Sequence, residues 1–147
     1  MDAIQLLKTD HKKVEKIFTD LENKTDDRRA LFPELDRELT VHAEIEEKIF
    51  YPSARQAEPT RDLVLESIEE HKQIKMVLAD LEQTDMRTAE WGADLKVLRE
   101  DVMHHVKEEE DELFPKIQQI LSEDQLADLG SRMEEMKMQL LSTARSR

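Results

Sequence analysis

HAEIEEKIFYP, residues 42–52, and HVKEEEDELFP, residues 105–115, are two versions of one pattern. Each begins with a histidine, has a glutamate four residues later, and ends with an aromatic residue and a proline. Residues four apart on an α-helix point to the same side, one turn apart. Each stretch therefore predicts a helix that offers an imidazole and a carboxylate to one point in space.

Each of these polar pairs lies on an apolar helical stripe. Apolar residues recur in steps of three and four over residues 32–49 and 91–120, and the histidine and glutamate of each pair take positions within those steps. Two further stripes, over residues 4–21 and 64–81, each contain one histidine. The six polar residues on the four stripes, which are the candidate site, are His11, His42, Glu46, His71, His105 and Glu109.

The neighbouring residues His104 and Glu108 have the same spacing as the second pair but a different helical phase. They are rotated by about a hundred degrees around the helix from His105 and Glu109. We therefore expect His104 and Glu108 to be partly solvated. The other pair, His105 and Glu109, should face the core.

The composition favours long helices. The chain has 147 residues, of which 2 are Gly, 4 are Pro and 39% are charged, a balance typical of an all-α domain. Short polar segments separate the four stripes, so we expect neighbouring helices to be antiparallel. The predicted fold is an antiparallel up-down-up-down four-helix bundle over residues 1–120, with Thr60 as the cap of the third helix.

The sequence after the fourth stripe predicts one more helix. Ser122 and Gln125 have the spacing of a capping box, and an amphipathic, Met-rich segment follows them. We expect residues 121–147 to form a C-terminal helix. It would pack on the bundle, on a protein partner, or on a second copy in a homodimer.

The charge and the cysteine count exclude several classes of function. The net charge is −13, which disfavours nucleic acid and anionic membrane surfaces as partners. The chain has no cysteine, so disulfides and thiolate ligands are excluded. No stretch approaches the roughly 20 apolar residues of a membrane-spanning helix, and the N-terminal residues do not have the form of a signal peptide. We expect a soluble cytoplasmic protein.

Six polar side chains on core-facing stripes need a common explanation. A carboxylate buried without a partner costs several kcal/mol, or its pKa rises until it is neutral. Two metal ions held by the imidazoles and carboxylates would remove this cost, and such ligand sets in four-helix bundles hold iron or manganese pairs. We therefore predict a dimetal centre, with iron first and zinc or manganese as alternatives.

The arrangement resembles the hemerythrin-like family, also called the HHE cation-binding domain. Its pattern is His, then His-x-x-x-Glu, then His, then His-x-x-x-Glu, and the six candidate residues match it within residues 1–120. The resemblance implies a non-haem di-iron centre with an oxo or hydroxo bridge and bridging carboxylates. Members of the family include oxygen carriers, oxygen or iron sensors, iron-sulfur repair proteins and peroxide-handling proteins.

This chain departs from the oxygen-carrier members at two positions. Carriers have a second histidine four residues after the third-helix histidine, where this chain has Lys75. Carriers also place the last carboxylate five residues after the last histidine, where this chain has Glu110, while Glu109 stands at four. The resemblance therefore implies a more oxygen-rich and more open site than that of a reversible carrier.

Three residues near the six are candidates for supporting roles. Tyr51, the only tyrosine, follows Glu46 by about a turn and a half, and Pro52 is expected to disturb the helix there. Tyr51 is either a neighbour or ligand of one metal, or a packing residue with a solvated hydroxyl. Lys75 and Glu110 are candidates for moving protons.

These observations predict a di-iron protein that meets a small oxidant such as dioxygen, hydrogen peroxide or nitric oxide. Peroxide disproportionation is the enzymatic form of this prediction. The non-enzymatic alternative is an iron- or oxygen-sensing module whose metal occupancy controls partner binding through the C-terminal helix. A third alternative is an interaction bundle without metal.

Overall fold

The computed structural model describes residues 1–23 and 25–145, and every regular element in them is a helix. The prediction of an all-α chain is therefore confirmed. Among the described residues, no helix combines the length and the apolar character that a membrane span requires. The elements are α1 (Ala3–Asn23), η1 (Thr25–Asp27), α2 (Arg28–Ile45), η2 (Glu46–Phe50), α3 (Tyr51–Ala54), α4 (Glu58–Gln83), α5 (Ala89–Glu108), η3 (Glu109–Leu113), α6 (Phe114–Ile120) and α7 (Glu123–Arg145).

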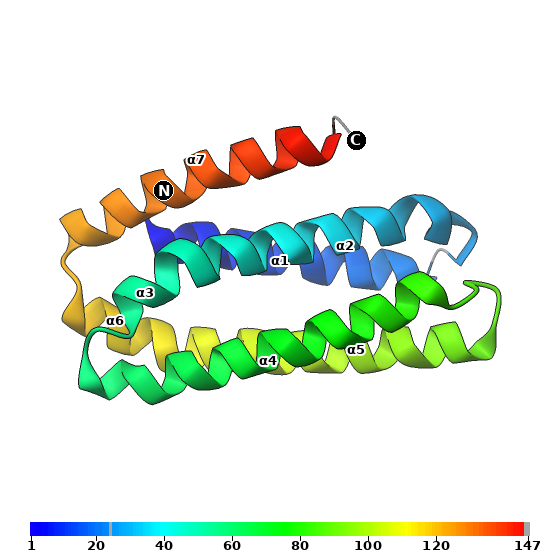
Figure 1. Cartoon of the computed structure of the whole chain (residues 1–147), viewed down its shortest axis with the longest axis horizontal. Coiled ribbons are helices and arrows are strands. Elements are labelled where there is room, and N and C mark those ends of the chain that lie inside the picture. The colour runs from blue at the N-terminus through cyan, green and yellow to red at the C-terminus, as the bar shows by residue number, and fades with distance from the viewer. Residues whose placement is uncertain (24, 146–147) are drawn as a thin grey trace.

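The columns built from α1, from α2 with α3, from α4, and from α5 with α6 lie side by side along the molecule (Figure 1). Helix α1 packs on α2, α2 on α4, α4 on α5, and α5 on α1, so the columns form a closed ring around one core. The π-helical segments η2 and η3 and the short helices α3 and α6 extend α2 and α5. Helix α7 lies outside the ring, against α1 and α2.

The core has two hydrophobic clusters with a polar layer between them. One cluster joins the start of α1 to η2, α3, α6 and α7, and the other fills the opposite end around the buried Trp91. Leu7 belongs to the first cluster and Val14 to the second. His11 stands between these two residues on α1, and the other stripe histidines have the same kind of position on their own helices.

The two π-helical segments occur at equivalent places in the two halves of the chain. Each begins at the glutamate of a predicted chelating pair and precedes an aromatic-Pro dipeptide. In η2 the amide of Tyr51 donates to the carbonyl of Glu46, five residues before it. A proline inside a helix has no N–H and clashes with the carbonyl four residues earlier. The wider turn before Pro52 accommodates that proline within a continuous helical column.

The starts of two helices test the capping predictions. Ser122 and Gln125 make the predicted reciprocal box, with hydrogen bonds of 2.8 Å and 3.1 Å between the side chain of each and the amide of the other. The prediction for Thr60 is wrong, because α4 begins two residues earlier at Glu58 with Ala57 as its cap. The buried hydroxyl of Thr60 donates instead to the carbonyls of the preceding turn.

Helix α7 packs very closely on the start of α1. Gly130 faces the backbone of residues 1–3, and a Cβ atom there would lie 2.4 Å from the carbonyl oxygen of Met1. The buried residues Leu126, Leu129 and Met133 bring α7 into the first hydrophobic cluster. The predicted C-terminal helix thus covers α1 and α2, while residues 146–147 of the predicted segment lie outside the described residues.

We predict opposite effects from alanine at the two glycines. Gly130→Ala should lower the free energy of unfolding by about 1–3 kcal/mol, because backbone atoms cannot move aside as a flexible side chain can. Gly92→Ala on α5 meets nothing within 4 Å, so it should raise stability by roughly 0.5–1 kcal/mol through helix propensity. Urea unfolding measures both. Equal effects of the two changes would contradict the close packing of α7 on α1.

A carboxyl pair away from the polar layer makes stability depend on pH. Burial and the nearby Glu82 carboxylate raise the pKa of Asp36 to about 7. The folded state therefore favours the neutral form of Asp36, whereas the unfolded chain ionises it near its ordinary pKa of 3.8. Its contribution to stability is fully present below the unfolded pKa and is lost as the pH rises towards 7.

We predict that Asp36→Asn stabilises the protein at pH 8 and has little effect at pH 4, because asparagine cannot ionise. Melting temperatures across this pH range measure the difference. Glu82→Gln should give a smaller gain with the same pH dependence, since it removes one cause of the raised pKa. A pH-independent effect of Asp36→Asn would contradict this account.

Candidate metal centre

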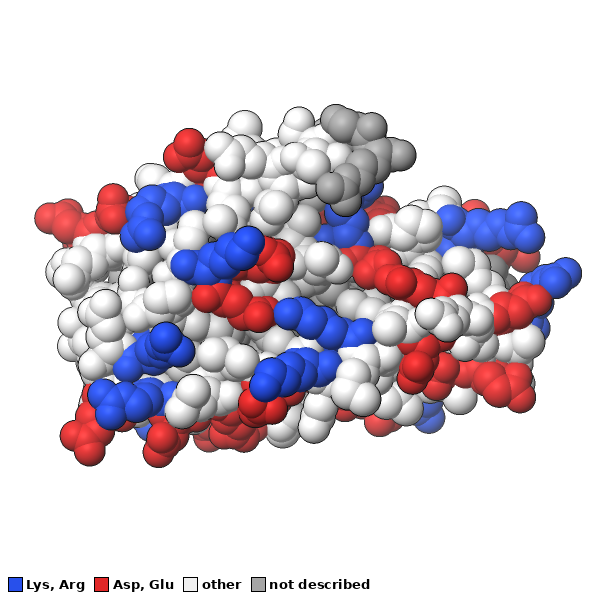
Figure 2. All heavy atoms as spheres, in the orientation of Figure 1, with Lys and Arg blue, Asp and Glu red and all other residues white. Residues whose placement is uncertain are grey.

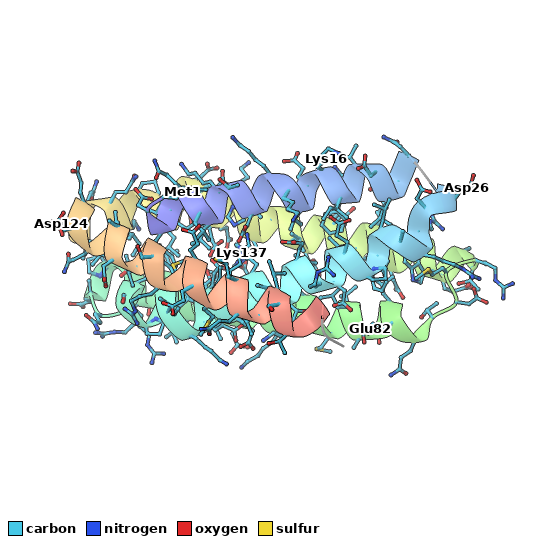
Figure 3. All side chains as sticks on the ribbon, turned by 90° about the horizontal axis from the view of Figure 1, so that it is seen from above. Met1, Lys16, Asp26, Glu82, Asp124 and Lys137 are labelled. Atoms are coloured by element: carbon cyan, nitrogen blue, oxygen red, sulfur yellow. The ribbon has the colours of Figure 1, made fainter. Side chains whose placement is uncertain are left out.

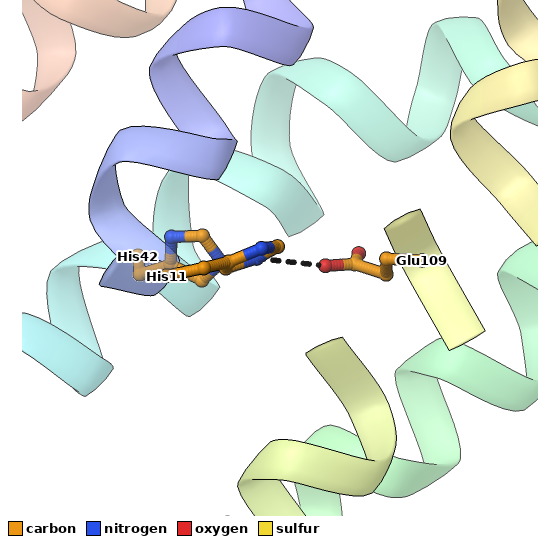
Figure 4. A group of neighbouring side chains, drawn as sticks. All are labelled: His11, His42 and Glu109. Carbon is orange, nitrogen blue, oxygen red and sulfur yellow. Dashed lines mark ion pairs between the residues drawn. The ribbon is translucent and has the colours of Figure 1, made fainter. Parts of the chain in front are cut away.

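The structure brings all six stripe residues together in the polar layer. They form two groups in which the possible ligand atoms lie within 4.8 Å of one another, and every member is buried. The first group is His11, His42 and Glu109, shown in Figure 4, and the second is Glu46, His71 and His105. Each group thus takes both imidazoles from one half of the chain and its carboxylate from the other half.

Each carboxylate also lies between the two groups. Glu109 Oε1 is 3.2 Å from His11 Nε2 and 3.5 Å from His105 Nε2. On the other side, Glu46 Oε1 is 3.0 Å from His42 Nε2 and 3.2 Å from His71 Nε2. A carboxylate that faces imidazoles of both groups is placed to bind either of two ions or to bridge them.

Several atoms at the centre of the layer have no hydrogen-bond partner. They are His11 Nε2, His42 Nε2, both carboxylate oxygens of Glu46, and Glu109 Oε1. Orphaned buried acceptors and donors are rare, because each costs about 1–3 kcal/mol. All five are ligand atoms of types that iron, manganese and zinc accept. The donor set therefore fits a pair of such ions.

The outer nitrogen of each imidazole contacts a carboxylate. The four Nδ1-to-oxygen distances are 2.6 Å for His11 and Glu110, 3.1 Å for His42 and Asp10, 3.0 Å for His71 and Glu47, and 2.7 Å for His105 and Glu70. An Nδ1–H that donates to a carboxylate leaves the Nε2 lone pair free for a metal and fixes the ring orientation. All four rings therefore present Nε2 inwards.

These outer carboxylates form a closed ring around the bundle, which we call the carboxylate ring: Asp10, Glu47, Glu70 and Glu110. Each is the sequence neighbour of an inner residue on its own helix, and each contacts a histidine on the next helix. Adjacent residues on a helix are about 100° apart, so the neighbour of an inward-pointing ligand points sideways. The order runs from α1 to α2, then α4, α5 and back to α1.

The π-helical turn of η2 places Tyr51 in the polar layer. Its hydroxyl donates to Glu109 Oε2 at 2.6 Å and lies 3.3 Å from His71 Nε2. Burial, followed by the charges of Glu109 and Glu46, raises the pKa of Tyr51 well above its ordinary value, so the phenol stays a donor. Tyr51 is fully buried, and its hydroxyl is therefore not solvated.

The equivalent residue in the second half is Phe114, which cannot donate. Its ring stacks on His11, with centroids 6.0 Å apart and an interplanar angle of 4°. The two halves therefore differ at the one aromatic position that reaches the layer.

A cavity of about 120 Å³ adjoins the imidazoles on the side of the second hydrophobic cluster. Its wall is mainly aliphatic, with Val14, Leu39, Ile74 and Val102 among the lining residues. Lys75 lines it too, and the ammonium group of Lys75 pairs with Glu47 at 3.1 Å. The space suits a small, weakly polar molecule next to the ligand atoms.

Mutual pairing keeps the layer charged without metal. Burial disfavours charge on the imidazole of His42, but the carboxylates of Glu46 and Asp10 raise its pKa to about 10. Burial also disfavours ionised Glu46, but the charge of His42 and the close side chains of Glu109 and His105 hold the pKa of Glu46 well below its usual value. A carboxylate buried without a partner would have a raised pKa, but the pKa of Glu46 is lowered because the neighbouring imidazolium outweighs desolvation.

The sequence singled out the inner residues and Glu110 but missed three members of the carboxylate ring. Asp10, Glu47 and Glu70 each stand next to a predicted ligand in the sequence, and this adjacency was the available signal. In a chain with 35 acidic residues it cannot separate ring members from solvated carboxylates such as Asp111. The packing of neighbouring helices makes that distinction.

We predict that Glu110→Ala weakens metal binding by about 10–100-fold, because it removes the group that orients His11. Asp111→Ala is the matched control, because this substitution removes the same charge from the next position in the sequence. Asp111 itself is exposed. Competition with a chelator of known affinity measures both. Equal affinities of the two variants would mean that the carboxylate ring does not position the imidazoles.

Comparisons with known proteins show the family of this chain and relatives that it resembles. The sequence model described as "Hemerythrin HHE cation binding domain" matches residues 2–117. A DNA nickase of Nostoc sp. is 28% identical over 142 residues, and the chain spans 40% of the length of that relative. A crystal structure of a hemerythrin HHE cation-binding-domain-containing protein from Mycobacterium kansasii has the same fold, with a TM-score of 0.88, 24% identity, and coverage of 99% of this chain and 91% of the other. The chain belongs to the hemerythrin HHE cation-binding domain family.

Proposed function

We propose that this chain is a di-iron protein that reacts with or senses a small oxidant: dioxygen, hydrogen peroxide or nitric oxide. Its scaffold in this proposal is an antiparallel up-down-up-down four-helix bundle over residues 1–120. The observation that carries the proposal is the pair of groups with orphaned inward-facing atoms beside a small aliphatic cavity. Four imidazoles with two bridging-capable carboxylates suit iron, and manganese or zinc are competitors for the same atoms.

The residues of this chain would divide the work as follows. Glu46 and Glu109 neutralise the ions, the four Nε2 atoms complete their coordination, and the carboxylate ring fixes the imidazoles. A bound iron pair would supply electrons and vacant coordination positions. Tyr51 holds a proton 2.6 Å from Glu109 Oε2, and it is placed to hydrogen-bond an oxidant that enters the layer.

The cavity supports a small substrate. The aliphatic side chains of Val14, Ile74 and Val102 exclude water from one side of the layer and offer few polar contacts to a larger molecule. Lys75 at the edge of the cavity is half-exposed and pairs with Glu47, which in turn contacts His71. This chain of contacts is a route for protons between solvent and the layer.

A second candidate function is a sensor without turnover, and the position of α7 favours it. Lys137 on α7, labelled in Figure 3, pairs with Asp10. Asp10 in turn contacts His42 Nδ1 at 3.1 Å. A change at His42 would therefore reach a helix on the outside of the bundle, where a protein partner or a second copy could bind. Oxygen evolution from added peroxide separates the two candidates, because only a di-iron enzyme that disproportionates peroxide produces oxygen.

The name of the Nostoc relative raises DNA as another partner, but the charge of this chain disfavours it. The net charge is −13, and on the face in Figure 2 the Lys and Arg side chains are interspersed with carboxylates. Such a surface repels a phosphate backbone. We propose that this chain does not bind nucleic acid, and that the nickase name describes a property of the longer protein.

We predict two iron ions per chain after iron loading and dialysis, with near-ultraviolet absorption typical of a coupled ferric pair. His105→Ala should lose at least one ion, because His105 lies in the second group, whereas His104→Ala should keep both. Elemental analysis of the folded variants measures this. One ion or none in the folded wild type would refute the proposal, and equal losses from the two variants would refute the assignment of the ligands.

A further inference from the structure

A third group of possible ligands lies outside the buried layer, on the surface between α4 and α5. It consists of His104, Glu108 and Glu70, whose ligand atoms lie within 4.8 Å of one another. His104 Nε2 is 3.0 Å from Glu108 Oε1 and 3.5 Å from Glu70 Oε2. The phase of the sequence predicted that His104 and Glu108 would be partly solvated, and the side chain of His104 is 65% exposed.

Glu70 connects this group to the buried layer. Its Oε1 atom contacts Nδ1 of the buried His105 at 2.7 Å, and its Oε2 atom faces the exposed His104. The outer group therefore meets the inner group at one direct contact, between the carboxylate of Glu70 and the imidazole of His105. The doublets His104-His105 and Glu108-Glu109 give the column of α5 and η3 two parallel chelating pairs, one turned to the core and one to solvent.

An ordinary surface ion pair explains only part of this arrangement. His104 and Glu108 are four residues apart on one helix, and such a pair needs no metal. The second carboxylate, from α4, is held in place by the contact of Glu70 Oε1 with His105 Nδ1, and its other oxygen adds a third possible ligand atom to the exposed pair. Within residues 1–23 and 25–145, the ion pairs of Glu70 and Glu108 are with His104 and His105 alone, so no Lys or Arg neutralises the two facing carboxylates.

The surroundings would attract a cation and leave it room for water ligands. His104 lies between two surface hollows of about 300 Å³ and 250 Å³. The carboxylate side chains that line them, apart from Glu70 and Glu108, are Glu66, Glu69, Asp101, Asp111 and Glu112. These carboxylates outnumber the one lysine, Lys107, that lines the second hollow, and such an excess of negative charge raises the local concentration of cations.

We propose that Glu70, His104 and Glu108 form a third cation site, which holds one exchangeable divalent transition-metal ion such as Mn²⁺ or Fe²⁺. One imidazole with two carboxylates suits these ions better than it suits Ca²⁺ or Mg²⁺, which prefer oxygen ligands throughout. Three protein ligands on an open surface leave the remaining coordination positions to water. The site therefore binds more weakly than the buried centre and exchanges its ion with solvent.

The test is a titration with Mn²⁺, followed by the electron paramagnetic resonance signal of the free ion. It uses the full chain after iron loading and dialysis, with its iron content measured first. The expected result is one further Mn²⁺ per chain. His104→Ala and Glu108→Gln should each weaken its binding by at least about tenfold, because each removes a ligand, and loss of even an outer partner of a ligand costs about 10–100-fold.

Glu112→Gln is the matched control, because it removes the same charge from the wall of one hollow without removing a member of the group. It should change the affinity by less than about twofold at physiological ionic strength. Equal weakening by Glu112→Gln and Glu108→Gln would overturn the proposal in favour of diffuse attraction. So would the lack of a further bound ion in the folded wild type at Mn²⁺ concentrations on the order of 1 mM.

The result is separable from the test of the buried centre. If the chain takes up no iron but binds one Mn²⁺ with the variant pattern above, the di-iron proposal fails and the third site stands. If iron fills the buried centre and the variants bind Mn²⁺ as the wild type does, the proposal of a third site fails and the di-iron proposal stands. Circular dichroism melting of each variant excludes unfolding as the cause of a loss.

Discussion

The burial of two carboxylates in a helical core is the constraint on which the rest of this structure depends. Glu46 and Glu109 are both fully buried, and an isolated carboxylate in such a place costs several kcal/mol. An inner layer of imidazoles and an outer ring of further carboxylates offset this cost. Each outer group stands beside an inner one in the sequence, so four dipeptides supply the whole outer ring and four of the six inner residues.

Much of the fold was predictable because apolar periodicity is a local property of the sequence. The four stripes located the long helices, and the gaps in the stripes located all six inner residues. The capping box of Ser122 and Gln125 was equally local, and it formed as predicted. Local sequence patterns were sufficient to predict the position of a residue wherever that position depends on one helix alone.

Features that depend on two helices, or on irregular backbone, were not predictable. Glu70 gains its role only because α5 presents His105 to it, and the packing of α7 on α1 depends on backbone atoms that meet Gly130. The π-helical turns shifted the phase after each glutamate, so regular helical spacing could not place Tyr51 in the layer. The pKa of Glu46 also depends on groups from other helices.

The difference between Tyr51 and Phe114 breaks the internal symmetry of the site. The two halves supply matching imidazoles, carboxylates and π-helical turns, but one half adds a phenol and the other an apolar ring stacked on His11. Two ions bound in these groups would have unequal surroundings and hence unequal reduction potentials. The layer is therefore directional: a small molecule that enters it would meet a phenol donor from one half of the chain and an apolar ring from the other.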